Sequence, residues 1–266
     1  MTILQSIVLG IVQGITEFLP ISSSAHLVIV PSIFGWEQQS ILFDIIIHLA
    51  TLTAIIYFYR KKLLNLGTTI LSIEPNSSTK ARRILLNISL TTIPLVLSAV
   101  VFKSAIDNWA ESIYLISFAL IVIGMFLVND KLFFKDTLEI SQLTKKSAFL
   151  IGLAQAFALL RGVSRSGATI LAGGLMGLSK KEAIDYAFLA SIPAILASFF
   201  YLLIQLTNSN TFIENPLSLI AGFISALISS YLAISFLLKF IQRHDFKLFG
   251  YYRIVLGIFL IISISL

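Results

Sequence analysis

Long apolar segments alternate with short polar connections along this chain, and six of the segments are long enough to cross a lipid bilayer. A transmembrane helix needs about 20 mostly apolar residues. The six segments fall near residues 41–59, 85–102, 112–129, 184–206, 217–239 and 249–266. This pattern predicts an all-α, polytopic membrane protein with six transmembrane helices.

Two further apolar segments, 1–30 and 147–178, are interrupted near their middles by proline, glycine and serine. In the first, serines 22–24 follow Pro20, and in the second the interruption spans 162–167. Proline kinks a helix, while serine and glycine favour caps and turns over helix interiors. We interpret both segments as re-entrant helical hairpins whose tips lie inside the membrane, where irregular backbone must be buried or wet. The alternative is one kinked, membrane-spanning helix in each case.

The two halves of the chain share the same order of elements, because each has one broken segment followed by three spans. The first half is 1–129 and the second is 147–266. Several residues align between them: Gly10 with Gly152, Gln13 with Gln155, and Ser22 to Ser24 with Ser164 to Ser166, while Asp44 falls near Asp185. Three crossings per half would invert the second half. The sequence therefore predicts one membrane domain, 1–266, built from inverted-topology repeats, with polar sites near the bilayer midplane.

Basic residues indicate how the chain is oriented. Most of the 19 lysines and arginines lie in the stretches 60–83, 130–146, 180–181 and 239–253. These stretches share one side of the membrane only if the two broken segments do not cross it. Cytoplasmic loops carry an excess of Lys and Arg, so we expect these stretches in the cytoplasm and both termini outside. The two hairpins then enter from opposite sides, and their tips are able to meet.

Composition agrees with a membrane location, since 57% of the residues are hydrophobic and 12% are charged. Soluble domains carry about 25% charged residues. The absence of cysteine excludes disulfides and thiolate metal sites. The basic residues form no continuous face, so nucleic acid is not expected as a partner. No basic segment precedes the first apolar stretch, and we therefore expect no cleavable signal peptide.

The first polar cluster lies at the interruption of 1–30 and offers an acid, hydroxyls and an imidazole. A charge at membrane depth costs at least about 2.5–3.5 kcal/mol unless it is paired or hydrated, which makes it a candidate functional group. Glu17 lies four residues after Gln13, on the same helix face, and is able to bind a divalent cation, orient water or accept a proton. His26 is a candidate base, acid or nucleophile. Ser23 is a candidate nucleophile. The structural alternatives are helix packing for Glu17, a satisfied buried histidine for His26, and a helix cap for Ser23.

The second polar cluster centres on Arg165, whose guanidinium suits bidentate phosphate binding. Hydroxyl and backbone N–H groups around it would form an anion site at a helix start; they belong to Ser164, Ser166, Gly167 and Thr169. The alternative role of Arg165 is an intramembrane ion pair, for instance with Glu17. His48 and Asp44, one turn apart, would join the same cavity or serve structure only.

At these residues the chain resembles the undecaprenyl-pyrophosphate phosphatase family, also called bacitracin-resistance proteins, over essentially its whole length. The resemblance rests on the Gln/Glu-x-x-x-Glu pattern at Gln13, on the Glu-Phe-Leu-Pro-x-Ser-Ser stretch at 17–23, on His26, and on the Gly-x-Ser-Arg-Ser-Gly-x-Thr stretch at 162–169. It implies hydrolysis of a C55 isoprenyl diphosphate to the monophosphate, which regenerates the lipid carrier of cell-wall synthesis and confers bacitracin resistance.

The resemblance also implies roles for individual residues. Those expected at the reaction centre are Glu17, Ser23, His26 and Arg165. Those expected to bind substrate are Ser22, Ser164, Ser166, Gly167, Thr169, Arg161 and His48. Glu17 and Gln13 would handle a divalent cation, Mg²⁺ or Ca²⁺. The family commonly has proline where this chain has Arg161, which adds either a second phosphate contact or a charge that reaches outward.

The expected protein is therefore a multi-pass phosphatase of the bacterial inner membrane, with its site facing the exterior, acting on a polyprenyl diphosphate among membrane lipids. A transporter or flippase of a polyprenyl phosphate or another anion is the alternative, because inverted repeats and polar tips suit both. A scaffold without catalysis would leave both polar clusters unexplained. The sequence leaves the oligomeric state open, with a homodimer among the alternatives.

Overall fold

The computed structural model describes residues 1–71, 75–109, 112–134, 137–207 and 215–265. The described residues fold as α1 (Ile3–Phe18), α2 (Ser23–Phe34), α3 (Ile41–Leu71), α4 (Pro75–Val101), α5 (Lys103–Trp109), α6 (Ile113–Val128), α7 (Lys145–Ala156), α8 (Arg165–Leu175), α9 (Lys180–Thr207), α10 (Pro216–Phe240) and α11 (Lys247–Ser265). Three short 3₁₀ turns complete them: η1 (Asp130–Leu132), η2 (Ile140–Gln142) and η3 (Phe157–Leu159). The all-α prediction is confirmed. Lys135, counted above among the basic residues, and Leu266, the last residue of the sixth expected span, lie outside the described residues.

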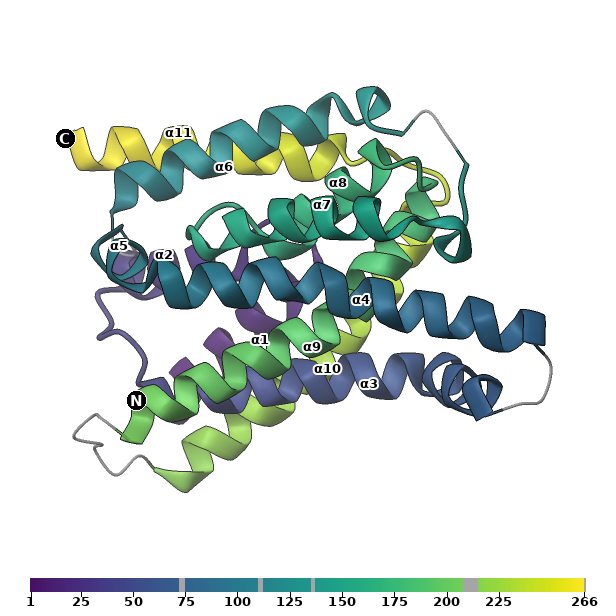
Figure 1. Ribbon diagram of the computed structural model, residues 1–266. Coiled ribbons are helices and arrows are strands. Elements are labelled where there is room, and N and C mark those ends of the chain that lie inside the picture. The colour runs from purple at the N-terminus through teal and green to yellow at the C-terminus, as the bar shows by residue number, and fades with distance from the viewer. Residues whose placement is uncertain (72–74, 110–111, 135–136, 208–214, 266) are drawn as a thin grey trace.

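Within the described part, four helices are long and apolar enough to cross a membrane, namely α3, α4, α9 and α10. The other two expected spans are shorter helices, α6 with 16 residues and α11 with 19, which lie side by side (Figure 1). Helix α3 continues to Leu71, well beyond the predicted end at residue 59. The apolar run stops where the basic residues begin, but charged side chains do not end a helix.

Both broken segments are pairs of helices that return to the end of the molecule from which they came. Helix α1 begins beside the start of α3, whereas α7 and α9 begin at the opposite end (Figure 1). The chain between α1 and α2 is interrupted at 19–22, and the chain between η3 and α8 at 160–164. Both segments are therefore helical hairpins and not single kinked helices, while the position of their tips inside the membrane stays a prediction.

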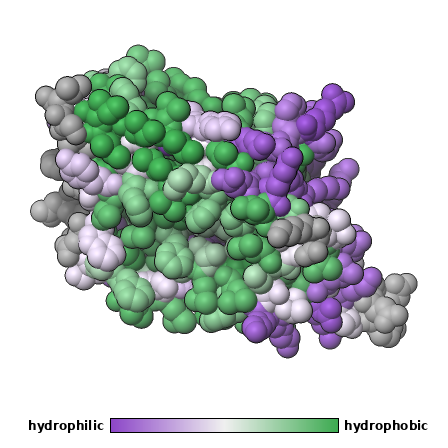
Figure 2. Space-filling view, turned by 90° about the horizontal axis from the view of Figure 1, so that it is seen from above, coloured by the Kyte–Doolittle hydropathy of each residue, from purple (hydrophilic) through white to green (hydrophobic). Residues whose placement is uncertain are grey.

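Polar residues gather at one end of the bundle. The last turns of α3, α6 and α10 and the first turns of α4, α7 and α11 lie there, opposite the start of α1 and the end of α11 (Figure 1). Figure 2 shows hydrophilic side chains concentrated at this end, while most of the remaining visible face is hydrophobic. Here Lys180 binds Asp130 and Asp245, each at 2.6 Å, and ties α9 to the ends of two other helices. The hydrogen bond from Lys180 lowers the pKa of Asp245 below its usual value.

Glycines allow helices of the two halves to pack closely. A Cβ atom on Gly10 of α1 would lie 2.5 Å from the Gly222 carbonyl oxygen of α10. A Cβ atom on Gly152 of α7 would lie 2.6 Å from the Thr91 carbonyl oxygen of α4. Small residues permit such contacts between membrane helices. In the predicted repeat, α1 corresponds to α7 and α10 corresponds to α4. The α1–α10 contact is therefore the counterpart of the α7–α4 contact. The inverted repeat stays a prediction, and this pairing favours it.

Arg253 holds the two chain breaks together. The sequence pattern assigned it to the basic stretch 239–253, but its side chain is completely buried within the bundle. The guanidinium donates hydrogen bonds to the carbonyl oxygen of Pro20 (3.0 Å) in the first break and to those of Gly162 and Val163 (3.1 Å) in the second. It also reaches two carbonyl oxygens of α6. Only arginine offers five donors in a fixed fork, so one side chain fixes both breaks.

Replacing Arg253 should therefore destabilise the fold. We expect Arg253→Met to lower the free energy of unfolding by about 2–4 kcal/mol, because buried carbonyl groups would lose a charged donor. Denaturant unfolding in detergent micelles measures this change. Arg60→Met is the matched control, since Arg60 donates to the Tyr57 carbonyl and lies over that ring at the surface. Equal stability of the two variants would contradict the role given to Arg253.

Candidate functional site

Two serines with left-handed backbone start the helices on either side of the site. Ser22 precedes α2 with a φ of 76°, and Ser164 precedes α8 with a φ of 71°. They are the two non-glycine residues with positive φ among those described. Such a backbone costs about 1–3 kcal/mol and tends to be kept at functional sites. The predicted repeat aligns these two serines, so both breaks turn into their helices in the same way.

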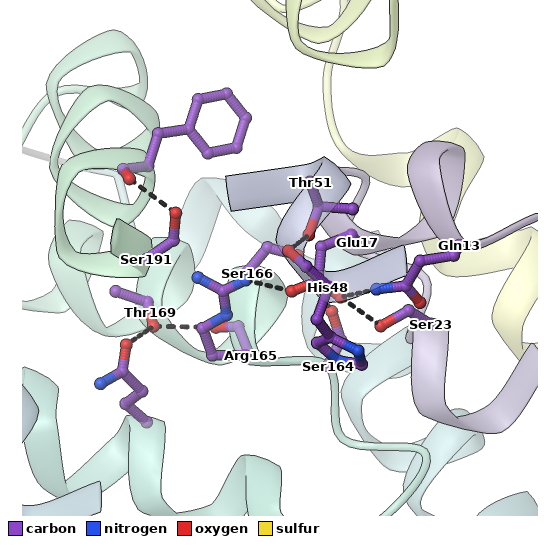
Figure 3. A network of polar contacts seen from close by, with 12 residues as sticks. Gln13, Glu17, Ser23, His48, Thr51, Ser164, Arg165, Ser166, Thr169 and Ser191 are labelled. Carbon is purple, nitrogen blue, oxygen red and sulfur yellow. Dashed lines mark hydrogen bonds and ion pairs between the residues drawn. The ribbon is translucent and has the colours of Figure 1, made fainter. Parts of the chain in front are cut away.

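The carboxylate of Glu17 collects the polar groups of both breaks. It lies in the last turn of α1 and is buried. It accepts hydrogen bonds from the Ser23 hydroxyl at 2.6 Å and from the Gln13 amide at 3.2 Å. Its other oxygen forms an ion pair with Arg165 (Figure 3). The ion pair that the sequence offered as an alternative is thus present, and it joins residues 148 positions apart.

Arg165 is the first residue of α8, and Ser23 is the first residue of α2. A helix start presents free N–H groups and the positive end of the helix dipole, which suit a phosphate. The two starts, together with Glu17 and His48, line a cavity of about 170 Å³. This cavity therefore offers an acid, a hydroxyl and a guanidinium to a bound anion.

A larger polar vestibule of about 590 Å³ adjoins this cavity and shares Ser23, Ser24, His48 and Ser198 with it. Asp44 and Arg161, both singled out from the sequence, line the vestibule. Other walls come from the α2–α3 connection and from the second half of α9. The vestibule therefore leads from the cavity toward the end of the bundle that holds the termini (Figure 1).

His48 of α3 lies beside Glu17 and faces both cavities (Figure 3). Its Nδ1 lies 2.8 Å from the carbonyl oxygen of Asp44 and therefore carries a proton. The other ring nitrogen, Nε2, is left for a ligand or a water molecule. The placement of His48 in the cavity agrees with the sequence expectation.

His26 is turned away from the cavity. Its Nδ1 donates to the Ser22 carbonyl oxygen at 2.7 Å, and its Nε2 accepts from the Tyr252 hydroxyl at 2.6 Å. The histidine and tyrosine rings also stack. The expected trio of Glu17, Ser23 and His26 is therefore split, because His26 occupies the face of α2 that packs against α11. Its position favours a structural role.

The remaining predicted residues mostly shape the breaks. The Ser22 hydroxyl accepts from the Gly162 N–H at 3.2 Å, and the Ser166 hydroxyl donates to the Leu19 carbonyl at 3.1 Å, so each break is bonded to the other. The Ser164 hydroxyl caps α8 by accepting from the Gly167 N–H.

Thr169 and Gly167 lie behind the cavity. Thr169 is completely buried and donates to the Arg165 carbonyl at 2.8 Å and to Gln155 at 3.4 Å. Gly167 packs closely on Ser164. Neither residue lines the cavity, so the geometry does not favour the direct substrate contact that the sequence led us to expect for these two.

Sequence reasoning missed Tyr252 and the structural role of Arg253. Both lie in the predicted span 249–266. The presence of Arg253 at membrane depth could have indicated its role, but charge counting assigned this arginine to the neighbouring basic stretch. Ser198 was not singled out either, because a lone serine in an apolar helix carries no sequence signal.

The oxygen donors needed for a divalent cation are present only in part. No group of three His, Cys, Asp or Glu side chains able to hold a metal occurs in the part of the chain that the structure describes. However, the Gln13 side-chain oxygen is buried without a hydrogen-bond partner beside Glu17. Magnesium commonly binds through one or two protein oxygens plus substrate phosphates. Glu17 and Gln13 fit that kind of shared site.

Comparison with known proteins adds to this geometry. Residues 6–259 match the family model described as bacitracin resistance protein BacA. Proteins named undecaprenyl-diphosphatase from Methanobrevibacter smithii, Ruthia magnifica and Chloroherpeton thalassium are each 39% identical to this chain. The alignments cover 97%, 98% and 100% of this chain and 96%, 98% and 98% of those proteins. The chain therefore belongs to the family of bacitracin resistance protein BacA.

Proposed function

We propose that this protein hydrolyses undecaprenyl diphosphate to undecaprenyl phosphate and inorganic phosphate, and so recycles a lipid carrier of cell-wall synthesis. The names of its relatives support this substrate. One observation carries the chemistry. The Glu17 carboxylate holds the Ser23 hydroxyl on one side and the Arg165 guanidinium on the other, at the wall of a cavity between two helix starts.

Substrate binding would rearrange the ion pair. A diphosphate carries more negative charge than one carboxylate, so it competes with Glu17 for the Arg165 guanidinium. Glu17, freed from its cationic partner, becomes a stronger base for the Ser23 proton. The free N–H groups at the starts of α2 and α8 add further donors for the terminal phosphate.

Ser23 is the nucleophile that the geometry favours, because its hydroxyl already donates to a carboxylate at 2.6 Å. The Ser23 oxygen attacks the terminal phosphorus while its proton passes to Glu17. The bond from that phosphorus to the bridging oxygen breaks, and undecaprenyl phosphate leaves with the bond electrons. The leaving undecaprenyl phosphate takes the proton from Glu17, so the carboxylate becomes a base again. Glu17 then deprotonates a water molecule that attacks the Ser23-bound phosphorus, and the Ser23 oxygen leaves with that proton, which releases inorganic phosphate. Arg165 stabilises the charge on the transferred group in both steps.

Replacing any of these three groups should stop turnover. We expect Arg165→Ala to lower the rate of phosphate release about 10³-fold or more, as for arginines that stabilise phosphoryl transfer. Glu17→Gln should lose about 10²-fold or more, because the general base is gone. Ser23→Ala should abolish release, whereas His26→Asn should retain measurable turnover. The assay is phosphate release from farnesyl diphosphate by purified protein in detergent.

Two results would overturn this assignment. Near-normal turnover of Arg165→Ala and Glu17→Gln would remove both groups from the reaction. Loss of all turnover in His26→Asn, with normal folding and an active Ser23→Ala variant, would make the histidine the nucleophile. Thr68→Ala is the control, because Thr68 lies near the end of α3 that is far from His48. A wild-type protein that moves the lipid across vesicles without releasing phosphate would establish transport instead.

We also propose that a divalent cation, Mg²⁺ or Ca²⁺, assists binding, held by Glu17, Gln13 and the phosphates of the substrate. Such an ion would neutralise diphosphate charge. The unpartnered oxygen of Gln13 supports this proposal.

A carboxylate in place of Gln13 should strengthen cation binding. We expect chelation by EDTA to abolish phosphate release and Gln13→Glu to lower the half-maximal Mg²⁺ concentration about tenfold, since it adds one anionic ligand. Gln155→Glu, at the aligned position behind Thr169, is the control. Full activity in EDTA, or an unchanged Mg²⁺ requirement in Gln13→Glu, would reject the cation site.

The site is proposed to open to the exterior of the inner membrane. The vestibule walls include Gln38 and Gln39, at the end of the bundle opposite the basic connections. Basic loops are expected in the cytoplasm.

Because the chain has no cysteine, single cysteines test this orientation directly. In intact cells we expect a membrane-impermeant maleimide to label Gln38→Cys and to spare Lys181→Cys at the basic end. Both should react after the cells are broken. The opposite labelling pattern would place the vestibule in the cytoplasm.

A further inference from the structure

An apolar groove of about 490 Å³ lies beside the second break, between η3 and α6. Its walls include Leu115, Phe118 and Val122 of α6, and Phe157 and Leu160 near the break. Phe118 is 65% exposed and Phe157 is 67% exposed, so the groove opens on a face of the bundle that contacts lipid. The volume lies within the range of small-molecule sites, about 300–1,000 Å³.

The groove adjoins the catalytic cavity. Leu159 of η3 lines both the cavity that contains Glu17 and the apolar groove. Arg161, two residues later, lines both the polar vestibule and the groove. The three spaces therefore meet at the segment between η3 and α8.

Arg161 is the one charged residue among the described residues that line the groove. It is half-buried, and no carboxylate in the described part of the chain forms an ion pair with it. An unpaired charge at membrane depth is costly and is usually kept for a ligand. Here Arg161 lines both a polar space and an apolar one, which matches the junction of a phosphate and a hydrocarbon chain.

We propose that the groove binds the first isoprene units of the substrate and that Arg161 binds the phosphate that remains on the prenyl chain. The order of groups in the substrate then matches the order in the protein. The terminal phosphate lies at Ser23 and Arg165, the chain-bearing phosphate at Arg161, and the chain in the groove, from which it continues into lipid. This inference rests on the proposed function for the identity of the substrate.

A second apolar groove, of about 770 Å³ between α1 and α10, is the alternative binding site for the prenyl chain. It is larger, and residues such as Ile11 and Ile224 line it. However, it shares no lining residue with the catalytic cavity or the vestibule, and no charged residue among those described lines it. Volume alone would favour this groove, whereas the lining residues shared with the cavity and the vestibule, and the charge of Arg161, favour the groove beside α6.

A photoreactive ligand locates the binding site of the prenyl chain without requiring turnover. The probe is a farnesyl bisphosphonate with a diazirine on its second isoprene unit, added to the purified full-length protein in detergent. We expect the label on Ile113–Val128, identified by peptide mass spectrometry, and less labelling in the presence of farnesyl diphosphate. Labelling of Pro216–Phe240 instead would overturn the proposal.

Kinetics separates the chain contact from the phosphate contact. Val122→Trp should fill the groove and raise the KM for farnesyl diphosphate about tenfold, with little change in kcat and none in the KM for methyl diphosphate. Ile224→Trp, in the competing groove, is the matched control and should change neither KM. Arg161→Gln should raise the KM for both substrates about tenfold, and Arg161→Lys should restore part of the loss. An unchanged KM in Val122→Trp or in Arg161→Gln would refute the corresponding contact.

The two measurements distinguish failure of this inference from failure of the proposed function. Wild-type protein that labels on α6 but releases no phosphate would keep the groove and reject the hydrolase. Wild-type protein that releases phosphate but labels on α10 would keep the hydrolase and reject the groove.

Discussion

The ion pair between Glu17 and Arg165 is the contact on which the site depends, because it joins the tips of two hairpins that enter from opposite ends of the bundle. The side chain of Glu17 is 8% exposed and that of Arg165 is 14% exposed. A buried ion pair is seldom more stable than apolar residues of the same size, so stability alone does not explain it. In the proposed mechanism, each group is the partner of the other until a phosphate arrives. The pair holds the empty site together, and the same two groups would then serve as a base and a cation.

The backbone around this pair is fixed in part by bonds between the two breaks. Ser22 accepts from Gly162, Ser166 donates to Leu19, and Arg253 donates to carbonyl groups of both breaks. These bonds satisfy polar groups that irregular backbone exposes inside a membrane. They also fix the distance between the starts of α2 and α8. A site held by its neighbours in this way needs little rearrangement to receive a phosphate.

Sequence reasoning found the two clusters because charged residues at membrane depth must have partners or a ligand. It therefore offered an ion pair between Glu17 and Arg165 as the alternative to phosphate binding by Arg165. It could not predict the direction of His26, because the face of α2 that this ring occupies depends on how α11 packs. It misplaced Arg253, because counting charges along a chain does not separate a buried arginine from one in a nearby loop. The length of α3 escaped it for a similar reason, since hydropathy reports the membrane boundary and not the end of the helix.

The predicted repeat gives these features a common origin. It aligns Ser23 with Arg165, and each is the first residue of a helix that follows a left-handed serine. The same local backbone thus presents a nucleophilic hydroxyl from one half and a guanidinium from the other, on two sides of one carboxylate. Two helix starts facing one cavity would repel each other through their dipoles if nothing negative lay between them. The carboxylate of Glu17 fills that position in the empty site, and a phosphate would take it over during the reaction. In the predicted repeat, the two aligned helix starts would form the anion site, and the difference between Ser23 and Arg165 at the aligned position would provide the nucleophile and the cation.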